Sequence, residues 1–286
     1  MLRDYRVVDA FSDRPLLGNP VAVILNAEGL DTAQMQAVAR WTNLSETTFV
    51  LPPSTPEADY RLRIFTPGSE LPFAGHPTLG TAHALIEAGL ATPREGKVVQ
   101  ECGVGLVDVT IQNIDGQTGL ALTMPEARFT PLSDEDAKEL ALIMGTRLNS
   151  APISVDVGPV WLVAETKSPE DLLALTPDYD RCAALERRLG ITGVSLFART
   201  EGENIEVRSF APSCGVNEDP VCGSGNGAIA AYRRHTGQMP AASWAYSSQQ
   251  GRCVGREGQI SLSVDANGKL TVGGQCITTV RGTINI

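Results

Sequence analysis

The chain has 286 residues, of which 42% are hydrophobic, and a formal net charge of −10 at pH 7. This length predicts two domains of ordinary size, and the hydrophobic content suits a globular protein with a sizeable core. The acidic balance argues against nucleic acid as a partner, because binding a phosphate backbone needs basic patches. It also argues against attraction to an anionic membrane surface.

The first half predicts short strands and two helices. Runs of β-branched, aromatic and alternating apolar residues predict strands at 5–11, 21–25, 47–51, 60–65, 98–102, 106–111 and 120–124. Helical spacing of apolar residues predicts one helix at 32–41, capped by Asp31, and another at about 78–88 that stops at Gly89. The start of the chain lacks the long apolar stretch of a signal peptide.

The second half repeats this order. We expect strands at 160–164, 194–198 and 205–210, helices near 169–175, 179–189 and 228–234, and closing strands near 243–247, 259–264 and 270–274. Strands dominate and each half has one long helix, which indicates an α+β fold rather than alternating βαβ units. The expected boundary at 125–131 gives an N-terminal domain at 1–127 and a C-terminal domain at 128–286.

Two segments, 63–85 and 207–232, are imperfect copies of each other. The motif Arg-x-Phe-x-Pro occurs at positions 63 and 208, an offset of 145, and a glycine stands at both 75 and 223, an offset of 148. Within the copies, Ala74-Gly75-His76 corresponds to Cys222-Gly223-Ser224. Two similar units can enclose one site, and the differences between the copies predict that this site is asymmetric.

Both copies contain a glycine-rich turn that leads into a helix. N–H groups at a helix start bind carboxylate or phosphate, and glycine lets a ligand approach the backbone closely. The repeat therefore predicts an anion pocket at Gly75, Gly223 and Ser224, whereas the alternative is that the glycines only make tight turns. The second turn also satisfies a dinucleotide-binding pattern. We reject that interpretation because Pro220 stands where a central strand should enter the turn.

Two side chains of the first half could carry acid–base chemistry. Glu46 opens an apolar strand, where desolvation would raise its pKa and suit it to general acid–base catalysis. Gly193 stands at about the equivalent place in the second half, so the acid exists in one half only. His76 lies in the first turn and could donate to a substrate or relay a proton. The alternatives are that Glu46 is an ordinary surface residue and that His76 only contributes to packing.

The second half offers Asp219 and Cys222. Cys222 stands at a helix start, where the helix dipole would lower the pKa of a thiol and favour thiolate. Its counterpart Ala74 cannot react, and the alternative is that Cys222 is a small buried filler. Asp219, three residues earlier, is either a site carboxylate or an ordinary turn aspartate. The six cysteines and three histidines show no metal-binding spacing, so we expect no metal and free thiols in a reducing cytoplasm.

Several motifs in order resemble the PhzF-like phenazine-biosynthesis family. They are VDAF at 8–11, GNP at 18–20, LSET at 44–47, FAGHPTLGTA at 73–82 and EDPVCGS at 218–224. The resemblance implies the diaminopimelate epimerase-like fold. This fold has two pseudo-symmetric domains, each a curved and mostly antiparallel sheet around a central helix, with the site in the cleft between them and no metal or organic cofactor.

The resemblance also implies roles for residues. Similar enzymes isomerise trans-2,3-dihydro-3-hydroxyanthranilate by moving a proton along an allylic system, and the glutamate matching Glu46 shuttles that proton. Residues matching His76, Asp219, Gly75, Gly223 and Ser224 surround the substrate and its carboxylate. Such proteins are usually homodimers. The chain departs from the pattern at Cys222, where the family generally has threonine.

Three hypotheses follow. The first is a cofactor-independent isomerase of a small carboxylic acid, with Glu46 as general acid/base and His76 and Asp219 orienting the substrate or relaying protons. The second is an epimerase or racemase of an amino or hydroxy acid that uses Glu46 and Cys222 as two bases. Cofactor-independent epimerases and proline racemases with the fold that the resemblance implies carry cysteine at both equivalent places. Their strict two-cysteine mechanism is excluded here, because Ala74 stands at the first of these places and only Cys222 at the second. The third is a non-catalytic protein that binds small acids.

Overall fold

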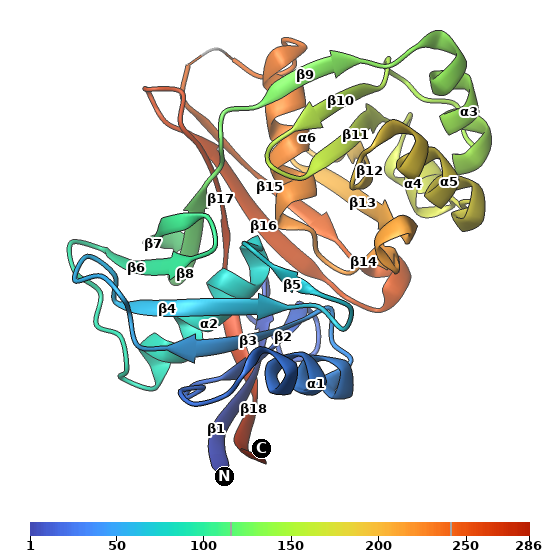
Figure 1. Ribbon diagram of the computed structural model, residues 1–286. Coiled ribbons are helices and arrows are strands. Elements are labelled where there is room, and N and C mark those ends of the chain that lie inside the picture. Colours follow the sequence, from blue (N-terminus) through green and yellow to red (C-terminus); the bar gives the residue numbers. More distant parts are fainter. Residues whose placement is uncertain (115, 241) are drawn as a thin grey trace. The chain divides into compact units, whose positions relative to one another are not determined.

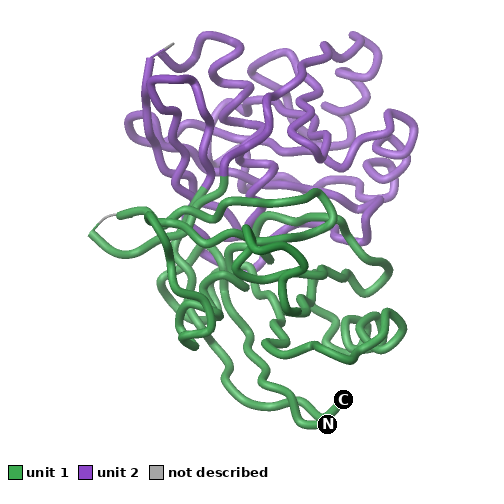
Figure 2. The backbone as a smooth tube through the Cα atoms, turned by 60° about the vertical axis from the view of Figure 1, so that its left-hand side comes forward, with its two compact units in different colours: residues 1–122, 273–286 green, residues 123–272 purple. Residues whose placement is uncertain are grey.

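The computed structural model describes residues 1–114, 116–240 and 242–286, and the chain divides into two compact units (Figures 1 and 2). Unit 1 comprises residues 1–122 and 273–286, and unit 2 comprises residues 123–272. The expected domains, 1–127 and 128–286, therefore need correction at the C-terminal end. Residues 273–286 belong to unit 1 because β18 (Cys276–Asn285) pairs antiparallel with β1 (Leu2–Ala10).

Unit 1 is a mostly antiparallel arrangement of strands packed on one central helix, α2 (Gly75–Glu87), which contacts β1, β2, β3, β7 and β18 (Figure 1). Its other elements, in chain order, are β2 (Asn19–Ile24), α1 (Thr32–Thr42), β3 (Glu46–Leu51), β4 (Tyr60–Phe65), β5 (Glu70–Leu71), β6 (Lys97–Cys102), β7 (Gly105–Ile114) and β8 (Gln117–Thr123). Helix α1 packs its buried face, which includes Met35 and Val38, against Phe49 and Phe65 of the sheet.

Unit 2 repeats this plan around α6 (Gly223–His235), which contacts β10, β11, β12 and β16. Its other elements are β9 (Arg128–Pro131), α3 (Asp134–Met144), β10 (Ile153–Asp156), β11 (Val160–Glu165), α4 (Pro169–Leu173), α5 (Tyr179–Leu189), β12 (Gly193–Arg199), β13 (Ile205–Ala211), β14 (Val216–Asp219), β15 (Trp244–Gln250), β16 (Gly258–Val264) and β17 (Leu270–Gly274). Short 3₁₀ turns lie at Pro212–Cys214 and Arg252–Val254.

The two units share one succession of strand pairings. In unit 1 the pairs β1–β2, β2–β3, β3–β4, β4–β6 and β6–β7 are antiparallel, parallel, antiparallel, parallel and antiparallel. In unit 2 the pairs β10–β11, β11–β12, β12–β13, β13–β15 and β15–β16 follow the same succession. The expected α+β class, with two similar units that each contain a central helix, is confirmed.

The repeated Arg-x-Phe motif has the same structural role in both units. Arg63 donates two hydrogen bonds of 2.7 Å to the carboxylate of Glu70, and Arg208 pairs with Glu218 through bonds of 3.0 and 2.7 Å. Each guanidinium also lies over the phenylalanine ring two residues further on, at 5.1 and 5.0 Å from the ring centroid. In each unit the arginine therefore stabilises the strand that precedes the glycine-rich segment, through a salt bridge and a cation–π contact.

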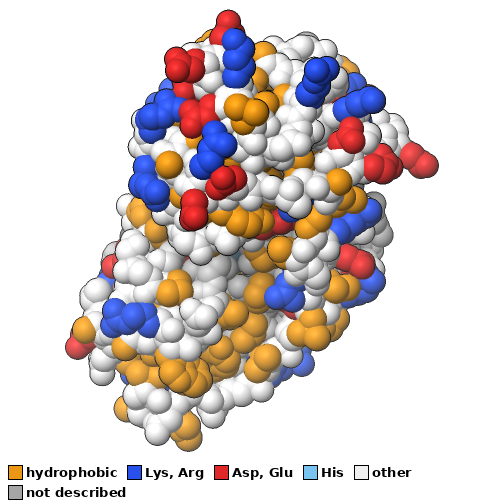
Figure 3. Space-filling view, turned by 90° about the vertical axis from the view of Figure 1, so that its right-hand side faces the viewer, with side chains coloured by type: hydrophobic (Ala, Val, Ile, Leu, Met, Phe, Trp, Pro, Cys, Tyr) orange, Lys and Arg blue, Asp and Glu red, His pale blue; other side chains and the backbone are white. Residues whose placement is uncertain are grey.

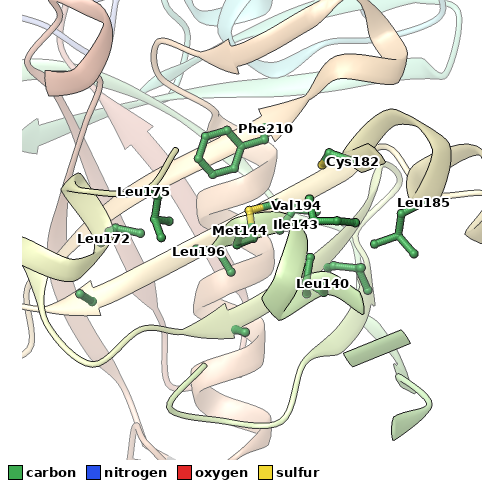
Figure 4. Packing of buried hydrophobic residues seen from close by; sticks show 13 residues of the cluster. Leu140, Ile143, Met144, Leu172, Leu175, Cys182, Leu185, Val194, Leu196 and Phe210 are labelled. Atoms are coloured by element: carbon green, nitrogen blue, oxygen red, sulfur yellow. The ribbon is translucent and has the colours of Figure 1, made fainter. Parts of the chain in front are cut away.

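The core of unit 2 contains a helix, α3, that the apolar spacing of the sequence does not predict. Ser133 caps its first turn, and Gly145 ends it in the left-handed conformation at φ 68°. Its buried face packs with α4, α5 and the strands β11 to β13 (Figure 4). The shared cluster consists of Leu140, Ile143, Met144, Leu162, Ala164, Leu172, Leu175, Cys182, Leu185, Val194, Leu196, Ala198 and Phe210.

On the face shown in Figure 3, Lys and Arg side chains are interspersed with Asp and Glu, so the charge on that face does not form a continuous basic surface.

Among the residues that the structure describes, no helix combines the length and the apolar character needed to cross a bilayer.

Candidate functional site

In unit 1 the structure brings Glu46 and His76 together. Glu46 is the first residue of β3, opposite Val21 in the parallel register of β2 and β3. Helix α1 ends at Asn43 in the left-handed conformation at φ 54°, which turns the chain so that β3 can begin three residues later. The imidazole Nε2 of His76 lies 3.3 Å from Oε2 of Glu46, and the two side chains are only 10% and 15% exposed.

Burial controls the ionisation of this carboxyl group. Desolvation raises the pKa of Glu46 from 4.5 to about 7, while a hydrogen bond from the Ser45 side chain opposes the shift. The expected desolvation of Glu46 is therefore confirmed. A carboxyl group with a pKa near 7 has substantial populations of both protonation states at neutral pH. It can accept a proton and later return it.

Gly75 and His76 form the first turn of α2, which begins three residues earlier than the sequence predicted. The glycine-rich segment is thus the start of the helix rather than a turn before it. Ala74 at the N-cap has no side-chain acceptor for the first N–H groups, and α2 lacks a side-chain cap hydrogen bond from it. N–H groups at such a helix start favour an anion.

In unit 2 the structure places Asp219, Cys222, Gly223 and Ser224 around the start of α6. Asp219 accepts a 3.0 Å hydrogen bond from the Val221 N–H through its side chain. Cys222 is the N-cap of α6, and Gly223 and Ser224 are its first two residues, five positions earlier than the predicted helix start. This segment is the structural counterpart of the α2 start.

Gln250, which the sequence analysis did not identify, supports this turn. Its side-chain amide donates to the Asp219 carbonyl at 2.9 Å, and its Oε1 accepts from the Cys222 N–H at 3.1 Å. It also accepts from the Asn226 side chain at 2.8 Å. A glutamine in a closing strand has no local pattern that links it to a turn about 30 residues earlier in the sequence.

The expectation that Cys222 favours thiolate is wrong. The side chain is buried, and burial raises its pKa well above the ordinary value, with the Asp219 carboxylate acting in the same direction. The Gly225 N–H does donate to Cys222 Sγ at 3.2 Å, as a helix start would suggest. The Ser224 side chain also favours the thiolate, but desolvation outweighs both contacts, so the thiol is protonated at neutral pH.

Trp161 of β11 is the second residue near the site that the sequence analysis missed. Its indole N–H donates to Ser224 Oγ at 3.1 Å, and the side chain is 3% exposed. Trp161 lies opposite Gly193 in the parallel register of β11 and β12. A Cβ added at Gly193 would lie 2.7 Å from the Trp161 ring and 2.2 Å from the Phe210 carbonyl oxygen, so this place has no room for a side chain.

The described residues contain no cluster of three or more His, Cys, Asp or Glu side chains that could hold a metal ion. A cavity of about 640 Å³ within unit 2 borders α6 toward the other end of the helix, where Arg234 and His235 line it. The chemistry expected at the start of α6 therefore does not involve that cavity.

The chain is similar to known proteins over nearly its whole length. The model of the family described as phenazine biosynthesis-like protein matches residues 8–282. The chain is 39% identical to a Schizosaccharomyces pombe protein named antisense-enhancing sequence 1, with 97% of each chain covered. It is 36% identical to the trans-2,3-dihydro-3-hydroxyanthranilate isomerase of Pseudomonas aeruginosa, over 93% of this chain and 91% of that one. A PhzF family crystal structure from Bacillus anthracis shares the fold, with a TM-score of 0.90, 24% identity and full coverage of both chains.

Proposed function

Because this chain belongs to the phenazine biosynthesis-like protein family and is an isomerase, we propose that it moves a proton between carbon atoms of a small carboxylic acid without a cofactor. Glu46 is the general acid/base in this proposal. The main support for this proposal is the Glu46 carboxyl group, which is buried beside His76. Burial raises the pKa of Glu46 to about 7.

In the proposed reaction, the Glu46 carboxylate removes a proton from a carbon near the substrate carboxylate. The negative charge that develops spreads onto that carboxylate and the conjugated system. The protonated Glu46 then returns the proton to a different carbon, so the reaction needs no external acid or base. A single group suits both steps only if its pKa lies near the working pH, which is the condition that burial creates for Glu46.

We propose that N–H groups at Gly75, Gly223 and Ser224 bind the substrate carboxylate. Donors fixed at helix starts stabilise charge as it develops and need no reorganisation during the reaction. His76 and Asp219 orient the substrate or relay protons. The first substrate to test is trans-2,3-dihydro-3-hydroxyanthranilate, because relatives 34–36% identical to this chain are named for that reaction.

The two-base alternative, with Glu46 and Cys222 acting as an epimerase pair, is less well supported. A base must lose its proton, and burial holds the Cys222 thiol in its protonated form. Substitution Cys222→Thr separates the two mechanisms. The one-base isomerase should retain turnover in this variant, whereas the two-base epimerase should lose it.

The test of the proposed function is hydrogen exchange in D₂O, followed by proton NMR. The panel is trans-2,3-dihydro-3-hydroxyanthranilate with small amino and hydroxy acids, and the proteins are the wild type, Glu46→Gln and the exposed control Glu57→Gln. We expect deuterium to enter carbon with the wild type and the control but not with Glu46→Gln. Saturable binding of an acid with no exchange in any protein would support a non-catalytic binding protein instead.

The proposal also includes a homodimer and a cytoplasmic location. A mass of twice one chain in light scattering would support the dimer, and the mass of a single chain would contradict it. Cell fractionation tests the location.

A further inference from the structure

The second residue of each central helix contacts one side chain from the neighbouring strands, but the two contacts differ in chemistry. In unit 1, His76 of α2 lies 3.3 Å from the Glu46 carboxyl group. In unit 2, Ser224 of α6 accepts a 3.1 Å hydrogen bond from Trp161. The helix residue thus contacts an acid in unit 1 and an indole in unit 2, although the indole comes from the strand equivalent to β2 rather than to β3.

The strand register explains why the second unit has no matching acid. Glu46 begins β3 opposite Val21, and Gly193 begins β12 opposite Trp161. The Trp161 ring and the Phe210 carbonyl occupy the space that a side chain at position 193 would need. The residue opposite the acid in unit 1 is Val21, whereas the equivalent residue in unit 2 is the larger Trp161, whose ring occupies the space beside Gly193.

The hydrogen bond to Ser224 has a direction that matters. An indole N–H can only donate, so Ser224 Oγ must accept, and its own proton is then left to donate to another group. Ser224 Oγ also lies 3.6 Å from Cys222 Sγ, and sulfur is a weak acceptor. A carboxylate oxygen accepts a stronger, charge-assisted hydrogen bond, so it would replace Cys222 Sγ as the acceptor of the Ser224 hydroxyl proton.

We propose that Trp161 is a positioning residue that directs the Ser224 hydroxyl proton toward the substrate carboxylate and, with Gly193, excludes a second acid at the place equivalent to Glu46. This inference rests on the proposed function, because it assigns the start of α6 to substrate binding. It makes the start of α6 a hydrogen-bond donor to the substrate carboxylate, without a second acid in unit 2.

A purely structural role for Trp161 makes a different prediction. If the ring only fills space, Trp161→Phe should leave substrate binding unchanged, because phenylalanine retains an aromatic ring and loses the N–H group. If the N–H group orients Ser224, the same variant should raise KM about tenfold with a change in kcat below about twofold, since a hydrogen bond to a charged group is lost.

The experiment measures kcat and KM for trans-2,3-dihydro-3-hydroxyanthranilate in Trp161→Phe, Ser224→Ala and the double variant. The control is Trp244→Phe, which removes an indole N–H that has no hydrogen-bond partner among the described residues. We expect the double variant to match Ser224→Ala, because both single changes remove one interaction. Equal KM values in Trp161→Phe and the control, or additive losses in the double variant, would overturn the proposal.

A second measurement does not depend on turnover or on the folding of Trp161→Phe. The chain has three tryptophans, so ¹⁵N-labelled protein gives three indole N–H signals for assignment. Anthranilate has a carboxylate but no saturated ring carbon that could lose a proton, so it serves as a non-reacting probe. The Trp161 signal should move in Ser224→Ala and on addition of anthranilate to the wild type. A signal that moves in neither case would contradict the proposal.

These results also separate the inference from the proposed function. If exchange at carbon occurs but Trp161→Phe behaves like its control, the inference fails and the proposed function stands. If no acid exchanges in the wild type, the proposed function fails, and the indole signals still report whether carboxylates bind beside Ser224.

Discussion

Replacement of Glu46 by glutamine should stabilise the protein at high pH while it abolishes turnover. Burial raises the pKa of Glu46 from 4.5 to about 7, so the folded state binds this proton more tightly than the unfolded state does. Both states are protonated below pH 4.5 and both are ionised above pH 7. Stability is therefore lost as pH rises between these values, and the loss amounts to about 3 kcal/mol. Glutamine is neutral at every pH and avoids it.

The assay is chemical unfolding of the wild type and Glu46→Gln at pH 4.5 and pH 8, where each protein's free energy of unfolding is measured at both pH values. The variant should gain about 3 kcal/mol relative to the wild type between the two pH values. Taking this difference cancels pH-independent effects of the substitution, such as altered packing. Glu57→Gln, which changes an exposed carboxylate, should show a much smaller pH-dependent gain. An equal pH dependence in wild type and Glu46→Gln would refute the argument that Glu46 ionises in a desolvated site.

Three further predictions follow from the same structure. The ratio kcat/KM should rise with pH through about 7 as Glu46 ionises. The variant Ser45→Ala should move this rise to higher pH, because it removes the hydrogen bond that favours the carboxylate. A profile that is flat from pH 5 to 9 would exclude Glu46 as the base. Substitution Arg208→Met should destabilise the chain by about 3–5 kcal/mol, because it leaves the Glu218 charge buried without its partner. In urea unfolding, Arg63→Met should have a clearly smaller effect, because the Arg63–Glu70 pair is more exposed. Equal effects of the two substitutions would contradict this prediction. Cys222 should react with a thiol-specific reagent far more slowly than the exposed Cys214 under native conditions, as peptide mapping can measure, and equal rates would show that its thiol is not protected.

Local pattern predicted most elements of both units but misplaced the starts of the two central helices. The sequence predicts turns at Gly75 and Gly223 that lead into the helices, and glycine has a low helix propensity. In the structure they form the first helical turn, where Gly225 allows α6 to approach Ser195 and Ser209; an added Cβ would lie 2.4 and 2.9 Å from their hydroxyl oxygens. Packing against the strands therefore overrides the local preference.

The sequence by itself determined the family, the strand-rich class and the asymmetry between Glu46 and Gly193, because each depends on residue identity and short-range pattern. The tertiary structure alone decided the protonation of Cys222, the contact of Trp161 with Ser224 and the return of β18 to β1. Ionisation depends on burial, and these contacts join residues 63 or more positions apart in the chain. No local pattern in the sequence records which distant segments will exclude water from a group or bring a donor to it.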